Sequence, residues 1–140
     1  MALDLSSLKK AVSALAAALA RSDDAQLMDK LDHVTRNTIQ AGVIQHFEFT
    51  YELCWKFIKR WLEVNVTATA ADGVTRRELF RMGAENRLID DVDPWMQYHE
   101  ARNLTSQTYQ PEIAEQVYRT CHEFARDAAR LLAALEKRND

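Results

Sequence analysis

Glycine and proline are scarce in this chain, with three Gly and two Pro in 140 residues. Average usage would place roughly 12% of residues in these two types, and they form many of the turns that connect strands. Their scarcity argues against a many-stranded sheet or barrel. The chain also lacks any continuous apolar run of the roughly 18 residues that a membrane span needs. The composition therefore favours a soluble, helical domain.

Cysteine is equally rare. Cys54 and Cys121 lie far apart, and neither belongs to a CxxC pair or neighbours a pair of histidines. Each lies among apolar residues at helical spacing, which predicts two free buried thiols rather than a disulfide or a metal site. The 18 Lys and Arg against 21 Asp and Glu give a net charge of −3, which excludes a general affinity for polyanions. Any nucleic acid must therefore bind at a local site.

The N-terminal part of the chain predicts helices of the fold rather than a secretory leader. Residues 11–20 are rich in alanine and follow two lysines, as in a leader. Asp4 and the amphipathic spacing of the leucines instead predict a first helix from about Asp4 to Arg21. A short helical segment over residues 27–34 follows, with a break expected near Arg36-Asn37. We therefore expect a cytoplasmic protein with no membrane association.

The most regular pattern in the chain spans residues 39–62, where apolar side chains recur every three or four positions. This stripe consists of Ile39, Val43, Phe47, Tyr51, Cys54, Ile58 and Trp61 or Leu62. Such spacing predicts one long amphipathic helix. Phe49, Trp55 and Phe57 widen its apolar surface. The helix is therefore expected at the centre of a bundle or in a subunit interface.

Capping signals mark the later helices. A capping box at residues 75–78 predicts a helix that ends near Arg87. Asp93-Pro94 predicts another helix start, and Gln110-Pro111 predicts the start of a last helix. The apolar stripe of this last helix runs nearly to the C-terminus and consists of Ile113, Val117, Cys121, Phe124, Ala128, Leu131 and Leu135. Long helices with short connections indicate an all-α fold. We expect residues 1–140 to form one domain, an antiparallel up-and-down bundle of four to five helices.

The usual catalytic signatures are absent, and the polar run at residues 102–109 stands out instead. Seven of its eight side chains can form hydrogen bonds, and the run lies where the preceding helix should end. Arg102 can hold a phosphate through two parallel N–H bonds, while Asn103, Thr105 and Tyr109 help to orient it. The alternative is a solvated helix end with Arg102 near the C-terminal dipole.

A polar row follows the long helix opposite its apolar stripe and consists of Glu48, Glu52, Lys56 and Lys59 or Arg60. Glu52 and Lys56 have the i,i+4 spacing of a surface pair worth about 0.3–0.5 kcal/mol. These charges can alternatively be partly buried against Arg102. The two carboxylates lack a third ligand at matching spacing, so we expect no metal and no cofactor. Among the histidines, His99 shares the helix face of Arg102.

Two motifs together resemble a known family. The first runs from His46 to Lys56 (HFEFTYELCWK) and the second from Arg102 to Tyr109 (RNLTSQTY), with Trp95 between them. They resemble the nucleotidyltransferase substrate-binding branch of the HEPN domains, and the resemblance covers nearly the whole chain. It implies an all-α bundle that forms a homodimer. It also implies a partner encoded nearby, a minimal nucleotidyltransferase that acts as the antitoxin of a HEPN toxin.

In that family, an Arg-x4-6-His motif forms a metal-independent ribonuclease site that is often shared across the dimer. The resemblance makes Arg102 the residue that clamps the scissile phosphate of RNA, and Asn103 the usual polar second position. Gln107 stands where the family has the histidine that moves the proton of the ribose 2′-hydroxyl. An amide cannot serve as a base near neutral pH, and such a loss costs roughly 10²–10⁴-fold in rate. The resemblance thus implies a weakened or lost ribonuclease activity.

Three explanations of Gln107 remain open. In the first, the chain is a natural family member that became a non-catalytic subunit and presents substrate or nucleotide to the nucleotidyltransferase. In the second, glutamine was introduced at position 107 to silence a toxin. In the third, His99 replaces the missing base. A purely structural oligomerisation protein is a further alternative. The clustering of Arg102, Asn103 and Tyr109 at one helix end argues against it.

Tyr109 keeps its motif position two residues after Gln107. In related pairs, the nucleotidyltransferase transfers AMP to the tyrosine of an Arg-x4-His-x-Tyr motif, so the resemblance makes Tyr109 the candidate acceptor. A phosphate-bearing adduct beside Arg102 would satisfy the guanidinium and exclude the phosphate of RNA. The alternative is an ordinary aromatic side chain packed against the bundle.

Overall fold

The computed structural model describes residues 2–139, and this part of the chain contains α-helices, one 3₁₀ turn and no strand. The elements are α1 (Ser6–Ser22), α2 (Ala25–Asp29), α3 (His33–Asn65), α4 (Arg76–Glu85), α5 (Val92–Leu104), the 3₁₀ turn η1 (Thr105–Gln107) and α6 (Pro111–Lys137). The predicted all-α bundle is confirmed. It has one helix more than the four to five expected, because α2 is a separate helix capped by Asp24, whose side chain accepts a hydrogen bond from Leu27 N at 3.1 Å.

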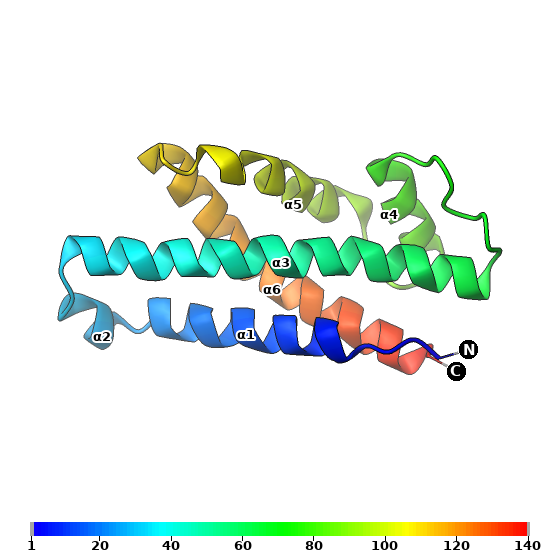
Figure 1. Ribbon diagram of the computed structural model, residues 1–140, viewed down its shortest axis with the longest axis horizontal. Coiled ribbons are helices and arrows are strands. Elements are labelled where there is room, and N and C mark those ends of the chain that lie inside the picture. Colours follow the sequence, from blue (N-terminus) through cyan, green and yellow to red (C-terminus); the bar gives the residue numbers. More distant parts are fainter. Residues whose placement is uncertain (1, 140) are drawn as a thin grey trace.

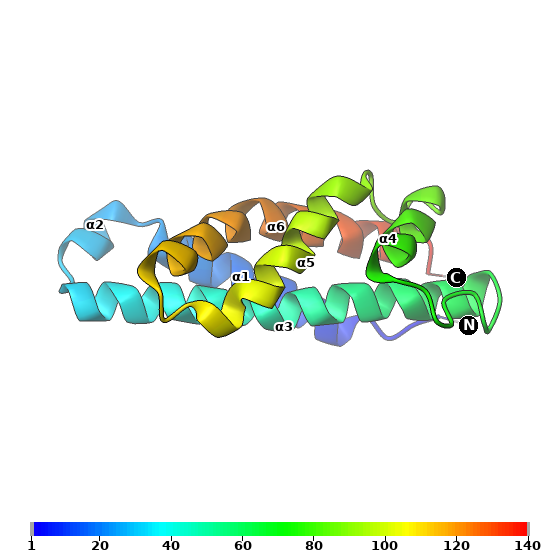
Figure 2. The same ribbon diagram turned by 90° about the horizontal axis from the view of Figure 1, so that it is seen from above.

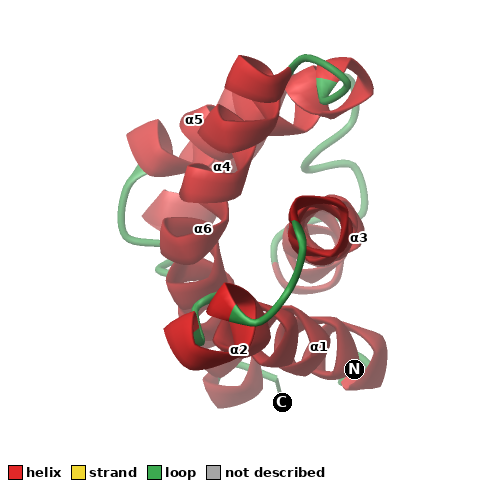
Figure 3. Cartoon of the chain, turned by 90° about the vertical axis from the view of Figure 1, so that its left-hand side faces the viewer, coloured by secondary structure: helices red, strands yellow, loops and turns green. Residues whose placement is uncertain are grey.

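Helix α3 runs along the longest dimension of the molecule (Figure 1) and packs against α1, α4, α5 and α6. The chain direction alternates along the bundle, with α1 antiparallel to α3 and α5 antiparallel to α6 (Figures 1 and 2). Viewed end-on, α1, α6 and α5 form an arc around α3 (Figure 3). Leu3 and Asn139 lie side by side, since Leu3 N donates to Asn139 Oδ1 at 2.7 Å and Asn139 Nδ2 donates to Leu3 O at 2.9 Å.

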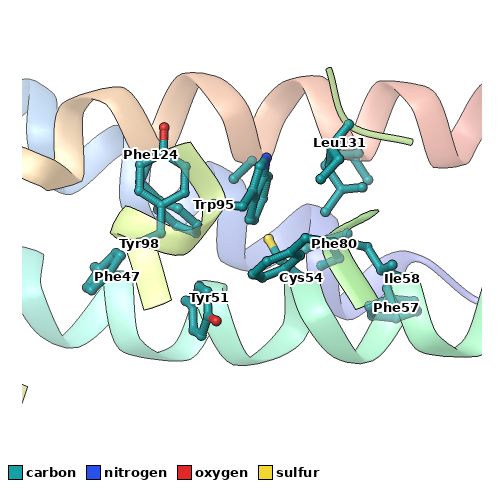
Figure 4. Packing of buried hydrophobic residues seen from close by; sticks show 14 of the residues in the cluster. Phe47, Tyr51, Cys54, Phe57, Ile58, Phe80, Trp95, Tyr98, Phe124 and Leu131 are labelled. Atoms are coloured by element: carbon teal, nitrogen blue, oxygen red, sulfur yellow. The ribbon is translucent and has the colours of Figure 1, made fainter. Parts of the chain in front are cut away.

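The core lies between α3 and α6, where the two predicted apolar stripes meet. Phe124 of α6 (Figure 4) packs edge-to-face against Phe47, Tyr98 and Trp95, with ring centroids 5.0, 5.2 and 5.9 Å away. Both Phe47 and Phe124 are fully buried. Edge-to-face aromatic pairs add roughly 0.5–1.5 kcal/mol each to the burial of their surface. This cluster fixes α5 against α3 and α6.

The break predicted near Arg36-Asn37 is wrong, because α3 already begins at His33. Asp32 caps its N-terminus and accepts a hydrogen bond from Thr35 N at 2.7 Å. Asn37 continues the helix and lies 3.2 Å from the ring of His33, one turn earlier. The first turns of α3 project beyond the core and carry mostly exposed residues. Their polar character therefore reflects exposure to water rather than a helix end.

Two other helix starts differ from the predictions by two residues. Helix α1 begins at Ser6, and Asp4 Oδ1 accepts a hydrogen bond from Ser6 N at 3.0 Å. Helix α5 is capped by Asp91 rather than Asp93, since Asp91 Oδ1 accepts from Asp93 N at 3.4 Å. Pro94 therefore lies within the first turn, where backbone N–H groups have no partner inside the helix and its missing N–H carries no penalty.

Other local predictions are confirmed, one of them in part. One half of the capping box forms, with Thr75 Oγ1 accepting from Glu78 N at 3.2 Å, while Glu78 Oε1 accepts from the Thr75 hydroxyl at 3.3 Å rather than from the backbone of Thr75. Pro111 is the first residue of α6. Cys54 and Cys121 are free and buried, and burial raises the pKa of both thiols. No helix within residues 2–139 is long and apolar enough to cross a membrane.

Candidate functional site

The polar run 102–109 covers the end of α5, the 3₁₀ turn η1 and the connection to α6. Arg102 lies in the last turn of α5, and its Nη1 donates to the hydroxyl of Thr105 at 2.9 Å. Thr105 Oγ1 in turn donates to the carbonyl oxygen of Arg102 at 2.7 Å. Thr105 is buried. It therefore both ends the helix and fixes the direction of the Arg102 side chain.

Arg102 points toward α3 and lies between two carboxylates. Its Nη1 is 3.5 Å from Glu48 Oε2, and its Nε is 3.3 Å from Glu52 Oε1, with all three side chains about one-third exposed. The two glutamates are thus partly buried against Arg102, one of the alternatives left open by the sequence. Lys56 instead is exposed, with its Nζ 5.7 Å from the ring centre of Trp55. It takes no part in the Arg102 cluster.

The Arg102 guanidinium is held by charge but is not fully hydrogen-bonded. Nε is buried and has no hydrogen-bond acceptor within residues 2–139, although Glu52 lies at ion-pair distance. The N–H of Nε is therefore not directed at that oxygen. An unsatisfied buried donor carries a penalty of roughly 1–3 kcal/mol. A phosphate oxygen that displaced Glu52 would supply the missing acceptor.

A network of aromatic and charged side chains extends from Glu52 to α4 and back to α5. Trp55 Nε1 donates to Glu52 Oε2 at 2.9 Å, and the guanidinium carbon of Arg76 lies 3.8 Å above the Trp55 ring. Arg76 Nη1 also donates to the hydroxyl of Tyr51 at 3.5 Å. That hydroxyl is 2.9 Å from Nδ1 of His99. The network therefore links three helices beside Arg102.

The sequence did not predict the roles of Tyr51, Trp55 and Arg76 in this network. The spacing of Trp55 three residues after Glu52 places both on one face of α3, and that signal was available. Tyr51 was predicted only as a core residue, and most of its ring is indeed buried. No sequence signal relates Arg76 to α3, because the connection between α3 and α4 has no periodic pattern.

His99 lies in the same network one turn before Arg102. Partial burial lowers the pKa of its imidazole, and the neighbouring charge of Arg76 lowers it further, while Glu52 and Glu100 act in the opposite direction. Burial and the charge of Arg76 both favour the neutral imidazole over the charged one. Its side chain meets Tyr51, whereas Arg102 meets the two glutamates of α3.

Three motif residues with a predicted role at the site face water. Asn103, Gln107 and Tyr109 are exposed, and Tyr109 exposes 80% of its surface. Its hydroxyl accepts a hydrogen bond only from the neighbouring Gln110 Nε2, at 3.4 Å. The alternative in which Tyr109 packs against the bundle is therefore wrong. Tyr109 stands at the rim of a groove of about 690 Å³ between α3 and α6.

Arg102 also borders a hollow on the surface of α3. This hollow of about 370 Å³ is lined by Gln45, Glu48, Phe49, Glu52 and Arg102. Phe49 exposes 61% of its surface there. Within residues 2–139, no group of three or more His, Cys, Asp or Glu residues is arranged to hold a metal ion. The chemistry available at the site is that of an arginine, two carboxylates, an imidazole, an amide and a phenol.

Comparison with known proteins identifies the family. Residues 3–137 match the family model described as nucleotidyltransferase substrate binding protein like. The chain belongs to this family. The match spans both motifs and confirms the resemblance to the nucleotidyltransferase substrate-binding branch of the HEPN domains.

A curated sequence and a solved structure, both from Haemophilus influenzae, are similar to this chain over nearly its whole length. A protein named probable ribonuclease HepT is 34% identical over 140 residues, covering 98% of this chain and 94% of its own length. A solved structure, described as the fold of a substrate-binding domain of a nucleotidyltransferase, has a TM-score of 0.91. It is 30% identical and covers 95% of this chain and 99% of that one.

A more distant structure shares the fold. A protein from Thermus thermophilus has a TM-score of 0.68 at 23% identity, with 89% of this chain and 98% of that chain covered. The helical bundle is therefore retained in relatives whose sequences differ at most positions.

Proposed function

We propose that this chain is the HEPN subunit of a two-component toxin–antitoxin pair, with RNA as its target and a nucleotidyltransferase as its partner. Family membership supports this proposal, as does the similarity to a protein named as a probable ribonuclease. Arg102 is the phosphate-binding residue of the site. Its guanidinium is fixed by Thr105 and still has a donor without an acceptor, which suits a side chain that exchanges carboxylates for a phosphate.

The site carries no base at the position of the family histidine. Gln107 can orient a phosphate or a water molecule, but its amide cannot take a proton from a ribose 2′-hydroxyl. Asn103 lies in the same turn of α5 as Arg102 and is exposed beside it. In a homodimer, the two exposed segments would combine into one cleft. Ribonuclease activity is accordingly weak or lost, while phosphate binding is retained.

Exposure of Tyr109 is the observation that carries the regulatory part of the proposal. Of the four tyrosines, Tyr51, Tyr98 and Tyr118 donate or accept hydrogen bonds within the bundle, through His99, Asp127 and Ser22 respectively. Tyr109 alone is largely exposed, at 80%. Its hydroxyl is therefore accessible to a second protein, and it lies in the same polar run as Arg102.

The partner transfers AMP to this hydroxyl. Tyr109 Oη attacks the α-phosphorus of ATP and forms an O–P bond. The bond between the α-phosphorus and the oxygen that bridges to the β-phosphorus breaks, and pyrophosphate leaves. The phenolic proton passes to a base of the nucleotidyltransferase or to water. The product is a phosphodiester that carries a negative charge and a nucleoside in the same polar run as Arg102. Such an adduct competes with RNA for the guanidinium.

Mass spectrometry tests this reaction. The chain is incubated with the nucleotidyltransferase encoded beside it and with ATP, and the mass is expected to increase by AMP while pyrophosphate is released. Tyr109→Phe should abolish the increase, and Tyr118→Phe should retain it as a matched control. A chain that gains no AMP, or that still gains it after Tyr109→Phe, rules out this assignment.

A second function is favoured by Gln107 itself. Without a base, the chain can serve as a non-catalytic subunit that presents a substrate or nucleotide to the nucleotidyltransferase. The structural relative described as a substrate-binding domain of a nucleotidyltransferase supports this alternative. The Gln107→His variant separates the two functions. RNA cleavage or toxicity in that variant indicates a silenced toxin, whereas inactivity of both forms favours the binding subunit.

A further inference from the structure

Arg76 is a half-buried arginine that pairs with no carboxylate of residues 2–139. Its guanidinium carbon lies 3.8 Å from the ring centre of Trp55, and its Nη1 donates to Tyr51 Oη at 3.5 Å. Stacking on an indole and one hydrogen bond fix the orientation of the guanidinium plane without neutralising its charge. Arg76 thus keeps donors that an anion can use.

A small hollow lies beside Arg76 and is lined by two cationic side chains. Its volume is about 150 Å³, and the lining residues are Trp55, Lys59, Ala71, Gly73, Val74, Thr75, Arg76 and Leu79. None of these residues is acidic. The hollow next to Arg102, in contrast, contains Glu48 and Glu52. The side chains that line this hollow are therefore cationic or uncharged, and the Glu78 carboxylate lies behind them, where it accepts a hydrogen bond from the Thr75 hydroxyl at 3.3 Å.

Trp55 links the hollow at Arg76 to the Arg102 cluster. Trp55 supports Arg76 with its ring face and donates through Nε1 to Glu52, which pairs with Arg102. Glu52 and Lys59 are seven residues apart on α3, so they are separated by about 10 Å along the helix axis. One short strand can therefore reach both places. His99 lies in the same network, bonded to Tyr51.

We propose that Arg76 and Lys59 form a second phosphate site, which binds the backbone of an RNA strand next to the phosphate held by Arg102. This inference rests on the proposed RNA-directed function and adds the path of the substrate along α3. A guanidinium and an ammonium around a hollow without acidic groups recognise a phosphodiester by charge and hydrogen bonding, without reading the base. The strand runs from the end of α5 toward the start of α4.

The salt dependence of RNA binding tests the second site. Filter binding with a single-stranded oligoribonucleotide gives the affinity of the full-length chain at several salt concentrations. Arg76→Gln and Lys59→Gln should each weaken binding and lower the slope of log affinity against log salt by about 0.7, the value for one phosphate contact. Arg102→Gln should weaken binding as well, because it removes the first phosphate site.

Arg77→Gln and Lys10→Gln are the matched controls. Arg77 follows Arg76 directly, is exposed and lies 4.0 Å from Asp93, and Lys10 is exposed on α1; neither lines the hollow. Both variants should keep the affinity and slope of the parent chain. Unfolding midpoints establish that Arg76→Gln still folds, and Lys59→Gln tests the site without removing a contact to Trp55 or Tyr51.

The outcomes separate the second site from the proposed function. If Arg102→Gln weakens binding while Arg76→Gln and Lys59→Gln behave like their controls, the second site is wrong and the RNA-directed function stands. If the parent chain does not bind RNA, both fail. If Arg76→Gln weakens the binding of ATP but leaves RNA binding unchanged, the hollow is a nucleotide site and the inference is overturned.

Discussion

The hydroxyl of Tyr51 lies 2.9 Å from Nδ1 of His99, and this contact joins α3 to α5 one turn before Arg102. Tyr51 is almost completely buried, so the imidazole is held against the core at its Nδ1 edge. The same hydroxyl accepts from Arg76 at 3.5 Å. One oxygen of α3 therefore aligns a histidine of α5 with an arginine of α4.

The pKa of His99 should lie below its ordinary value of 6.5. Burial is the main cause and the charge of Arg76 the second. Because the unfolded chain then binds more protons than the folded one, the stability that His99 contributes is complete above pH 6.5 and decreases as the pH falls below it. Arg76→Gln should raise this pKa in an NMR titration, while Arg77→Gln should leave it unchanged. Equal pKa values in the two variants would contradict the proximity of Arg76.

Thr105→Val should destabilise the fold by about 1 kcal/mol, because it removes the hydrogen bonds to Nη1 and the carbonyl oxygen of Arg102. The valine side chain is close in shape, so the loss comes from polarity rather than from a cavity. Thr105→Ser keeps the hydroxyl and should retain most of the stability. Urea unfolding measures the free energy of unfolding of both variants. A valine variant as stable as the serine variant would show that these hydrogen bonds contribute little.

Gln107→His should restore a base next to the phosphate site. We expect RNA cleavage to rise by roughly 10²–10⁴-fold over the parent chain, the usual contribution of a positioned acid or base. Cleavage of a labelled RNA in the presence of EDTA is the appropriate measurement, because the proposed mechanism needs no metal. Gln107→Asn is the control and should show no gain. Identical rates for the histidine and asparagine variants would favour the binding subunit.

Phe124→Ala should cost about 3–5 kcal/mol of stability, because it empties the centre of the aromatic cluster formed with Phe47, Tyr98 and Trp95. Phe49→Ala is the matched control on the surface. Phe49 is 61% exposed, and its truncation should change the free energy of unfolding by no more than about 0.5 kcal/mol. Similar losses for the two variants would show that the core is not centred on Phe124.

Hydrophobic periodicity predicted the fold because it records which face of each helix is buried. The stripes on α3 and α6 are long and regular, and from Val43 and Val117 onward the structure buries them as expected. The error at Arg36-Asn37 arose because an exposed helical turn and a helix break are equally polar. Local signals distinguish the two only through the cap, here Asp32.

The order of the motifs predicted that Arg102 lies at the end of a helix. The one-turn spacing of Glu48 and Glu52 indicated that both could lie against it. The contacts of Arg76 were not predictable in the same way. They depend on the path of the connection after Asn65, which places α4 beside Trp55. Neither the spacing of apolar residues nor helix propensity predicts that path. Side chains joined across helices need the crossing of those helices to be known.

Trp55 gives the molecule an optical reporter at the Arg76 hollow. Trp61 and Trp95 are 9% and 2% exposed, whereas Trp55 is only half-buried and lies directly beneath a guanidinium. A dissolved quencher such as iodide therefore reaches one indole far more readily than the other two. Its emission senses the charge stacked on it, so that occupation of the hollow can be followed by intrinsic fluorescence, without a label.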